Sequence, residues 1–436
     1  MKISKLLNKN ILIWGYGIEG RSVVELLLKN HVKNRIFVAT KEKLNEKLEN
    51  VEFIAESEIG KYDFDVAIKS PGVSSYRKQV QILSEKGTVI TSSLNIMLAE
   101  IIDHKNIKTI GITGTKGKST TASICNHMLN SLGKKSILVG NVGIPFLKVL
   151  DNPGEYEYIV MELSSCQLNN LMYEVDYGIV LNLYPEHIDW HLTHDNYYKD
   201  KLNIAKYSKK CFLNAKDAVT NEYLNVSSYS TFNSSNGFYL KDGHIFHTKD
   251  KIFDINSLDN IKGEHIFENI CSVLSILNSE KLDVNLALKS LASFKTLDHR
   301  LEVFFDNRKT NTKFVDDSIS TIPEATIRAI ETFKNDNIIL ILGGFDRKQD
   351  YSELTEYINS NDKIQKVFLL GQTGDRLCHK LKNSEKFDTL DNLVKSVKSL
   401  DLTNKTVLLS PAAASFDMFK NFADRGDCFK KLMVGK

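Results

Sequence analysis

Apolar residues occur along this chain in short runs that alternate with amphipathic stretches. In the first hundred residues these runs predict strands at 11–14, 35–39, 66–68 and 88–91, and a helical pattern at 21–29 follows the first run. Strands that alternate with helices form parallel sheets, because two parallel strands need a crossover connection between them. We therefore expect a Rossmann-like α/β domain at the N-terminus.

The alternation continues through the middle of the chain. There we predict strands and β-like runs at 107–110, 136–139, 158–162, 177–181, 211–213 and 237–253, and helices at 122–132 and 265–277. In the last third, strands at 313–315, 338–342, 366–370 and 406–409 again alternate with helical stretches. The sequence thus predicts an α/β protein of three domains, at 1–100, 101–296 and 297–436, with Rossmann-like sheets at both ends and a parallel sheet in the centre.

Composition narrows the class of protein. The 436 residues are 42% hydrophobic and 25% charged, and the net charge of +3 is spread along the chain without blocks, so no nucleic acid or membrane partner is expected. No apolar run approaches the roughly 20 residues of a membrane span. The six cysteines lie far apart without a Cys-x-x-Cys pair, which is typical of reduced thiols in a cytoplasmic protein.

A glycine-rich run follows the predicted strand at 107–110. It reads Gly111-Ile-Thr-Gly114-Thr115-Lys116-Gly117-Lys118-Ser119-Thr120 and precedes the predicted helix at 122–132. In this setting backbone N–H groups and a helix N-terminus bind phosphates, the lysine reaches the outer phosphates, and a hydroxyl can bind Mg²⁺. The run departs from the strict Gly-x4-Gly-Lys pattern at Ile112, but it still favours nucleotide binding over a simple turn.

A second glycine motif, Gly15-x-Gly17-x-x-Gly20, follows the strand at 11–14. It is typical of dinucleotide sites, but an NAD site also needs an acidic residue at the end of the next strand, and here that strand ends in Thr40-Lys41. We therefore favour a different phosphate-bearing ligand, with NAD as the alternative. Thr40 and Lys41 can contact it, and the turn Ser70-Pro71-Gly72 lies at the same predicted edge of the sheet.

Candidate metal ligands follow two strands of the central segment. Glu162 ends the strand at 158–162, where its carboxylate can hold Mg²⁺ beside Ser119. His187 and Asp189 lie in a histidine-rich stretch that by itself suggests zinc, whereas the phosphate loop favours Mg²⁺. His191 and His194 are interpreted as surface or hydrogen-bonding residues, and spacing alone does not single out Lys201 in the run Tyr197-Tyr-Lys-Asp-Lys201.

Taken together, these motifs resemble the Mur ligases of peptidoglycan synthesis along essentially the whole chain. The matching segments are Gly114 to Thr120, Glu162-Leu-Ser-Ser, His187-Ile-Asp-Trp-His, Tyr198-Lys-Asp-Lys201, Gly263-Glu-His265 with Asn269, and His299-Arg300-Leu-Glu. The run Ser410-Pro-Ala-Ala-Ala-Ser415-Phe-Asp with Phe422 and Arg425-Gly resembles the glutamate-adding members. The resemblance implies an ATP-dependent amide ligase, with a central ATPase domain, that joins glutamate to UDP-N-acetylmuramoyl-L-alanine through an acyl phosphate.

The resemblance also implies roles for single residues. It implies ATP-phosphate and Mg²⁺ binding by the loop Gly114–Thr120, with Lys118, His187 and Lys201 in catalysis and two Mg²⁺ ions held by Ser119, Glu162, His187 and a carbamylated Lys201. The other implied contacts are Asn269, Arg300 and Asp317 for the nucleotide; Gly15, Gly17, Ile18, Thr40, Lys41, Ser70, Pro71, Gly72 and Asn141 for the UDP substrate; and Thr321, Lys348, Ser415 and Phe422 for glutamate. Small-molecule substrates and a monomer are expected.

The chain departs from this pattern beside the expected glutamate site. Where Lys-Ala-Thr-Asn is expected after Asp317-Ser318, the chain reads Ile319-Ser-Thr321-Ile322-Pro323. This run resembles a branch of the family that adds L-glutamate, so the D-glutamate and L-glutamate alternatives both stay open here. A folylpolyglutamate synthase would lack the N-terminal glycine motif, and an NAD-linked oxidoreductase would leave the second phosphate loop unexplained.

Overall fold

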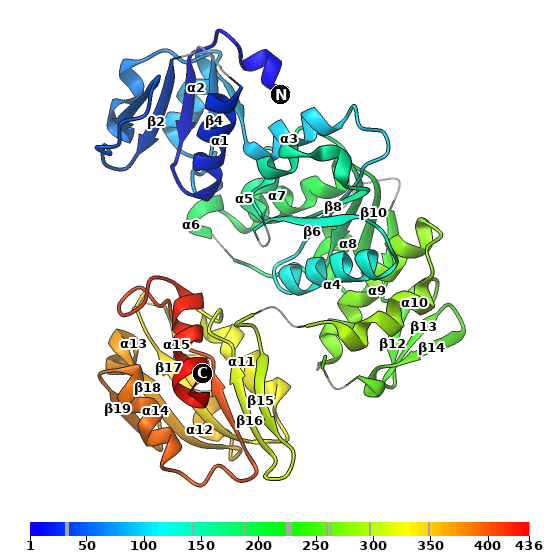
Figure 1. The fold of residues 1–436 in the computed structure, drawn as a ribbon, viewed down its shortest axis with the longest axis vertical. Coiled ribbons are helices and arrows are strands. Elements are labelled where there is room, and N and C mark those ends of the chain that lie inside the picture. Colours follow the sequence, from blue (N-terminus) through cyan, green and yellow to red (C-terminus); the bar gives the residue numbers. More distant parts are fainter. Residues whose placement is uncertain are drawn as a thin grey trace. The chain divides into compact units, whose positions relative to one another are not determined.

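The structure is a computed structural model that describes residues 1–30, 35–141, 144–186, 188–223, 229–258, 260–261, 263–295, 298–347 and 349–435 (Figure 1). The chain forms two compact units, Met1–Phe294 and Lys295–Lys436. The first unit contains two large parallel sheets and the second contains one mixed sheet. The predicted domain borders stay predictions, although the division after Phe294 lies two residues from one of them.

The N-terminal sheet has five parallel strands in the order β3-β2-β1-β4-β5. Its central strand β1 is buried along its whole length, as expected for an apolar strand covered on both faces. The strands are β1 (Ile11–Trp14), β2 (Ile36–Thr40), β3 (Val51–Ala55), β4 (Val66–Lys69) and β5 (Val89–Thr91), and the helices are α1 (Ile18–Lys29), α2 (Lys78–Glu85) and α3 (Ser93–Ile101). The sequence prediction missed β3.

The central sheet has six parallel strands in the order β11-β10-β9-β6-β8-β7. They are β6 (Lys108–Thr113), β7 (Ser136–Gly140), β8 (Tyr158–Glu162), β9 (Val175–Val180), β10 (Ser208–Asn214) and β11 (Tyr229–Phe232). A small antiparallel sheet follows, made of β12 (Phe238–Lys241), β13 (His244–His247) and β14 (Asp250–Asp254). The helices of this part are α4 (Lys118–Ser131), α5 (Ser165–Leu168), α6 (Ile188–His191), α7 (His194–Lys206), α8 (Ala218–Tyr223), α9 (Glu264–Ser279) and α10 (Val284–Ser290).

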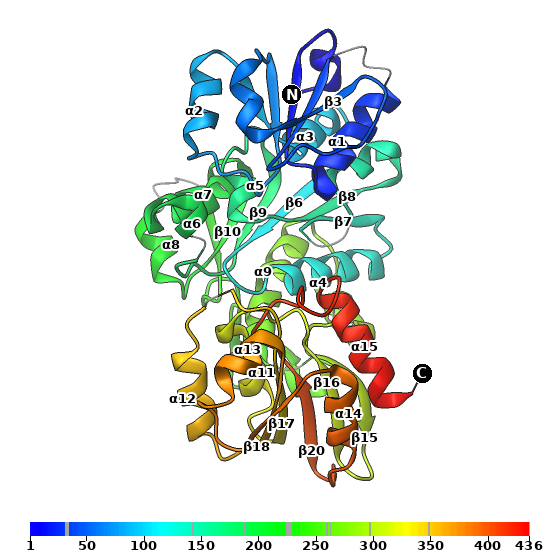
Figure 2. The same ribbon diagram turned by 90° about the vertical axis from the view of Figure 1, so that its left-hand side faces the viewer.

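Side chains alternate between the two faces of the central sheet. In β8, Val160 packs with residues of α4 and α9, whereas its neighbours Ile159 and Met161 pack with residues of α7. Figure 2 shows the sheet between α4 and α9 on one side and the region of α5 and α7 on the other. Because both faces are covered, β8 is apolar at every position up to Glu162, whose carboxylate ends the strand at the edge where ligands bind in α/β folds.

The second unit is built on a six-stranded sheet in the order β15-β16-β20-β17-β18-β19. β15 is antiparallel to β16 and the other pairs are parallel. The strands are β15 (Glu302–Asn307), β16 (Thr312–Asp316), β17 (Asn337–Gly343), β18 (Ile364–Leu370), β19 (Ser384–Phe387) and β20 (Lys405–Leu409), and the helices are α11 (Pro323–Thr332), α12 (Ser352–Ser360), α13 (Gly371–Leu377), α14 (Leu390–Lys398) and α15 (Phe422–Val434). The expected α/β class is confirmed, but the two edge strands β15 and β19 were not predicted.

No helix within the described residues is both long enough and apolar enough to cross a membrane.

Candidate active site

The phosphate loop lies between β6 and α4, as predicted. Its two glycines have positive φ angles, 155° at Gly114 and 85° at Gly117. A Cβ atom at Gly117 would come within 2.4 Å of the Nδ2 atom of Asn269, and one at Gly114 within 2.8 Å of the Leu181 Cβ atom. Only glycine fits both conditions, so the loop is tightly packed. The predicted nucleotide residue Asn269, on α9, thus lies directly against the loop.

Two lysine side chains meet at the backbone of this loop. The Nζ atom of Lys118 donates to the carbonyl oxygens of Gly114 and Thr115 at 3.0 and 2.9 Å. The Nζ atom of Lys201, on α7, donates to the same Gly114 oxygen at 2.6 Å. Burial and the neighbouring charge of Lys118 hold the pKa of Lys201 well below its usual range. Lys118 is therefore placed to neutralise an anion bound at the loop, whereas the surroundings of Lys201 favour its neutral amine.

A third lysine of the loop forms an ion pair. The Nζ atom of Lys116 lies 2.6 Å from the Oε1 atom of Glu186, the residue before His187. His187 itself lies outside the described residues, so its predicted role as a metal ligand stays a prediction.

Thr115 contacts the hydroxyl of Tyr197 at 2.9 Å, and Thr120 lies on the first turn of α4.

Glu162 is buried next to the first turn of α4. Its Oε1 atom accepts a hydrogen bond from the hydroxyl of Ser119 at 3.0 Å and one from the side-chain amide of Asn141 at 3.4 Å. Its Oε2 atom is inaccessible to solvent and has no hydrogen-bond partner among the described residues. A buried carboxylate oxygen without a donor is costly, and carboxylate and hydroxyl oxygens are the ligands that Mg²⁺ prefers. The residues present therefore fit a magnesium ion. Asn141, which was predicted to bind the UDP substrate, is hydrogen-bonded to this carboxylate.

The spacing of residues did not identify Lys201 as a site residue, yet its side chain is buried in the structure and only 2% exposed. Tyr197 and Lys201 are four residues apart on α7, and both lie on the buried face of that helix, whereas Lys199 is exposed. A helical-periodicity test over this segment would have placed Lys201 on the inner face. Of the two histidines interpreted as surface or hydrogen-bonding residues, His194 is exposed and His191 is fully buried and hydrogen-bonded.

The predicted substrate turns meet at the carboxyl edge of the N-terminal sheet. Gly15 has a φ angle of 95°, and a Cβ atom there would lie 2.9 Å from both the Cβ and Oγ atoms of Ser70. The hydroxyl of Ser70 donates to the Gly15 carbonyl oxygen at 3.1 Å. The other predicted substrate residues of this domain lie on the same or adjoining turns: Gly17, Ile18, Thr40, Lys41, Pro71 and Gly72. Of these, Ile18 is 75% exposed. The two motifs, 55 residues apart, therefore form one surface.

In the second unit, Asp317 follows β16 and is almost fully buried. Its Oδ2 atom accepts a hydrogen bond from the hydroxyl of Ser410 at 2.7 Å, and its Oδ1 atom accepts one from the Leu301 amide at 3.2 Å. Burial raises the pKa of Asp317 to about 6, although these hydrogen bonds and the charge of Arg300 oppose the rise. Two of the predicted nucleotide residues, Arg300 and Asp317, thus interact with each other.

The predicted glutamate residues lie on loops at one edge of the second sheet. Ser415 is buried after β20, Phe422 begins α15 and is 36% exposed, and Thr321 precedes α11. Lys348 lies outside the described residues. These loops share one partner, Arg425, to which the sequence analysis assigned no role.

Arg425 is a buried cation that holds three loops of the second unit together. Its guanidinium donates to the hydroxyl and carbonyl of Ser318, and to the carbonyl oxygens of Gly343, Ala413 and Ala414. Burial lowers the pKa of Arg425 to about 10. The sequence around Arg425 offered no signal for this role, because its partners lie on loops up to 107 residues away.

Comparison with known proteins identifies the family. Residues 112–277 match the model described as Mur ligase middle domain, and residues 7–86 match one described as C2185-like, N-terminal. The chain is 34% identical over 440 residues to the protein of Francisella tularensis subsp. novicida named UDP-N-acetylmuramoylalanine--D-glutamate ligase, and the match covers 99% of this chain and 96% of the relative. This chain belongs to the Mur ligase family.

Solved structures agree with the fold of this Mur ligase. The UDP-N-acetylmuramate-alanine ligase MurC of Thermotoga maritima has a TM-score of 0.60 at 18% identity, and the alignment covers 98% of this chain and all of that one. The MurF ligase of Thermotoga maritima in complex with ADP also has a TM-score of 0.60, at 17% identity, covering 99% of this chain and 95% of that one. The expected three-domain α/β fold is thereby confirmed.

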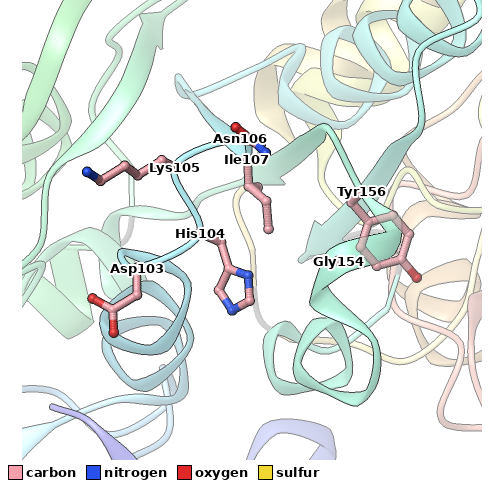
Figure 3. Close-up of a pocket in the computed structure, with 7 residues that line it drawn as sticks. All are labelled: Asp103, His104, Lys105, Asn106, Ile107, Gly154 and Tyr156. Atoms are coloured by element: carbon pink, nitrogen blue, oxygen red, sulfur yellow. The ribbon is translucent and has the colours of Figure 1, made fainter.

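One cavity of this Mur ligase is separate from the predicted site. It has a volume of about 410 Å³ and is lined by Asp103, His104, Lys105, Asn106, Ile107, Gly154 and Tyr156. Figure 3 shows that these residues come from the linker between α3 and β6 and from a segment before β8. None of the predicted site residues that the structure describes lines this cavity.

Proposed function

We propose that this Mur ligase adds D-glutamate to UDP-N-acetylmuramoyl-L-alanine at the expense of ATP and with Mg²⁺. The observation that carries the proposal is the meeting of Lys118, Lys201 and Glu162 around one phosphate loop. Support also comes from the relatives, which are named for this reaction at 32–34% identity over almost their whole length. The first domain would hold the UDP group, the second ATP, and the third glutamate.

In the first chemical step the alanyl carboxylate attacks the γ-phosphorus of ATP, and the bond to the ADP oxygen breaks. Lys118 stabilises the charge that develops on the phosphate oxygens, because it lies on the loop that holds them. Ser119 and Glu162, with His187 and Lys201, would hold the metal. When bound, Mg²⁺ supplies further charge neutralisation. The product of the step is an acyl phosphate.

In the second step the neutral amine of glutamate attacks the acyl carbon. A tetrahedral intermediate forms, the carbon–oxygen bond to phosphate breaks, and the amide remains, while the proton that the nitrogen loses leaves with the phosphate. Ser415 and the backbone at Phe422 can donate hydrogen bonds to a glutamate carboxylate, and Lys348 can offer its charge. The protein's contribution to both steps is alignment and electrostatic stabilisation rather than covalent chemistry.

We further propose that Lys201 becomes carbamylated. Its neutral amine would add to CO₂ and release one proton, which creates an oxygen anion that can bind Mg²⁺. Burial and a lowered pKa favour the neutral amine that this addition needs. We expect Lys201→Ala to lose turnover and short-chain carboxylic acids to restore part of it, whereas Lys199→Ala, an exposed neighbour, should keep wild-type turnover. Wild-type turnover by Lys201→Ala would remove Lys201 from the site.

The ligase reaction is tested by leaving out one substrate at a time. Phosphate release should require UDP-N-acetylmuramoyl-L-alanine and glutamate together, because the acyl phosphate forms only with the first and is consumed only by the second. Phosphate release at an unchanged rate without the UDP substrate would contradict the proposal.

The L-glutamate alternative is favoured by one observation, the run Ile319-Ser-Thr321-Ile322-Pro323 beside the glutamate residues. Offering the two enantiomers separately decides between them. Consumption of D-glutamate alone supports the main proposal, and consumption of L-glutamate alone assigns this chain to the L-glutamate-adding branch.

A further inference from the structure

A buried carboxylate, Asp200, lies on α7 immediately before Lys201. It is 5% exposed, and both of its oxygens accept hydrogen bonds. Its Oδ1 atom accepts one from the side-chain amide of Asn169 at 2.8 Å, and its Oδ2 atom accepts two, from the Nδ1 atom of His191 at 2.7 Å and from the hydroxyl of Tyr76 at 3.1 Å. When both oxygens of a buried carboxylate accept hydrogen bonds, the groups that donate them are held in fixed positions.

One of these partners comes from the N-terminal domain. Tyr76 ends the segment 70–76, which we call the substrate loop because it begins with the predicted substrate residues Ser70, Pro71 and Gly72. Burial and the charge of Asp200 raise the pKa of Tyr76, so its hydroxyl keeps its proton and acts as the donor. The substrate loop is thereby tied to the helix that carries Lys201.

Two more hydrogen bonds hold the substrate loop against the central domain. The hydroxyl of Ser74 donates to the Trp190 carbonyl oxygen at 2.6 Å, and the indole nitrogen of Trp190 donates to the Pro71 carbonyl oxygen at 2.9 Å. Trp190 precedes His191, the second partner of Asp200. The loop is therefore attached near its beginning to Trp190, the neighbour of His191, and at its end to Asp200 itself.

The same network reaches the strand end that carries Glu162. The Nδ1 atom of His191 faces Asp200, and the hydroxyl of Ser165 lies 2.9 Å from the Nε2 atom on the other side of the ring. Ser165 is three residues after Glu162 and begins α5. Asp200 is thus connected with all three predicted parts of the site: the substrate loop, the Glu162 turn and Lys201.

Serine, histidine and aspartate in this order are also the groups of a hydrolytic triad. Here Ser165 is 1% exposed and His191 is 0% exposed, so a substrate carbonyl has no access to the serine oxygen. These three residues therefore form a structural hydrogen-bond network, and Ser165 does not act as a nucleophile.

We propose that Asp200 is a positioning residue that holds the substrate loop and Lys201 in one fixed arrangement. The inference rests on the proposed function, because it concerns the alignment of the UDP substrate with the groups that activate it. Since the glycine turn and Ser70 hold the loop independently of Tyr76, loss of the Tyr76 hydroxyl leaves the UDP substrate bound but misaligned with the phosphate site.

The test is Tyr76→Phe, which removes the hydroxyl and keeps the ring that packs against Trp190 and His191. Loss of a hydrogen bond to a charged group should lower kcat about tenfold or more. The KM for ATP, and the Kd for the UDP substrate measured calorimetrically without ATP or metal, should stay within about twofold, since neither depends on the alignment. The matched control is Tyr62→Phe, whose hydroxyl donates to a different carboxylate, Glu52, at 3.3 Å, and whose kcat should not change.

A double-mutant cycle then tests whether Tyr76 acts through Asp200. Tyr76→Phe should add little to the loss caused by Asp200→Asn, whereas the effects of Tyr62→Phe and Asp200→Asn should be additive. If Asp200→Asn does not fold, the Tyr76 and Tyr62 variants alone decide.

Wild-type kcat in Tyr76→Phe would overturn the inference, and so would a fall in kcat that is matched by an equal loss of UDP-substrate affinity or shared by Tyr62→Phe. Absence of turnover in the wild-type protein would instead contradict the proposed function.

Discussion

The two glycine-rich turns of the first unit have the same position in their sheets but different surroundings. Each links a parallel strand to a helix at the carboxyl edge, and each contains a glycine with positive φ, at Gly15 and at Gly117. The first turn packs against the hydroxyl of Ser70. The second lies among lysine amines, because Lys118 and Lys201 both donate to the Gly114 carbonyl oxygen.

The difference shows what a glycine motif does and does not specify. Glycine allows the backbone to approach a ligand, but the charge that the site can neutralise comes from side chains on other elements. The N-terminal turn is suited to a ligand held by backbone groups and shape, such as a uridine nucleotide. The central turn, with the cation of Lys118 and the carboxylate of Glu162, is suited to a triphosphate and its metal.

The largest effect is expected at the central turn. Lys118→Ala should reduce kcat by on the order of a thousandfold or more, because the transferred phosphoryl group loses its fixed cation. Binding of the UDP substrate, measured by calorimetry, should be unchanged. The exposed Lys199 provides the control for loss of one positive charge, and turnover of Lys118→Ala near the wild-type rate would remove the distinction between the turns.

Gly117→Ala should raise the KM for ATP about tenfold to a hundredfold, since a positive φ disfavours alanine and the new methyl group meets Asn269. Steady-state kinetics at varied ATP concentration measure it. Gly154→Ala is the matched control, because no atom lies within 4 Å of its added Cβ. An unchanged KM would show that the loop does not need its present packing.

Gly15→Ala should have a smaller effect, and on the other substrate. The added methyl group would press on Ser70 at 2.9 Å, so we expect about a tenfold rise in Kd for the UDP substrate with ATP affinity unchanged. Gly60→Ala, with open space at its Cβ, is the control in the same domain. A loss of ATP affinity in Gly15→Ala would mean that the two turns do not serve separate ligands.

The smallest effect is expected at Lys41, an exposed residue at the end of β2. Lys41→Ala should weaken UDP-substrate binding about twofold to threefold, and less at high salt, because exposed charges are screened. Calorimetric titrations at two salt concentrations measure this. A hundredfold loss would show that the first turn depends on a lysine as strongly as the second does.

The sequence predicted those elements that have a clear local pattern, either an uninterrupted apolar run or a glycine motif. The strand β8 was predicted with its observed bounds, because its apolar run is uninterrupted up to Glu162. The glycine turns were found from their motifs, and Ser119 was expected beside Glu162, where the structure places it. Edge strands such as β15 and β19 were missed, since they are short and partly exposed and lack a strong apolar pattern.

The remaining features depend on tertiary contacts that no local pattern contains. Asp200 carried no sequence signal, yet it is buried and accepts a hydrogen bond from a tyrosine of the N-terminal domain, 124 residues away. Among the described residues, Arg425 has no acidic hydrogen-bond partner, because its donors are taken by backbone carbonyls and a hydroxyl of loops up to 107 residues away. Such partners are known only once the fold brings them together.

The most direct test of the account is calorimetric titration of the folded protein with ATP in the presence of Mg²⁺. The account predicts a binding heat for the wild-type protein and for Gly15→Ala, and its loss in Lys118→Ala, because the triphosphate binds at the central turn. Absence of heat with the wild-type protein, or an unchanged titration in Lys118→Ala, would contradict it.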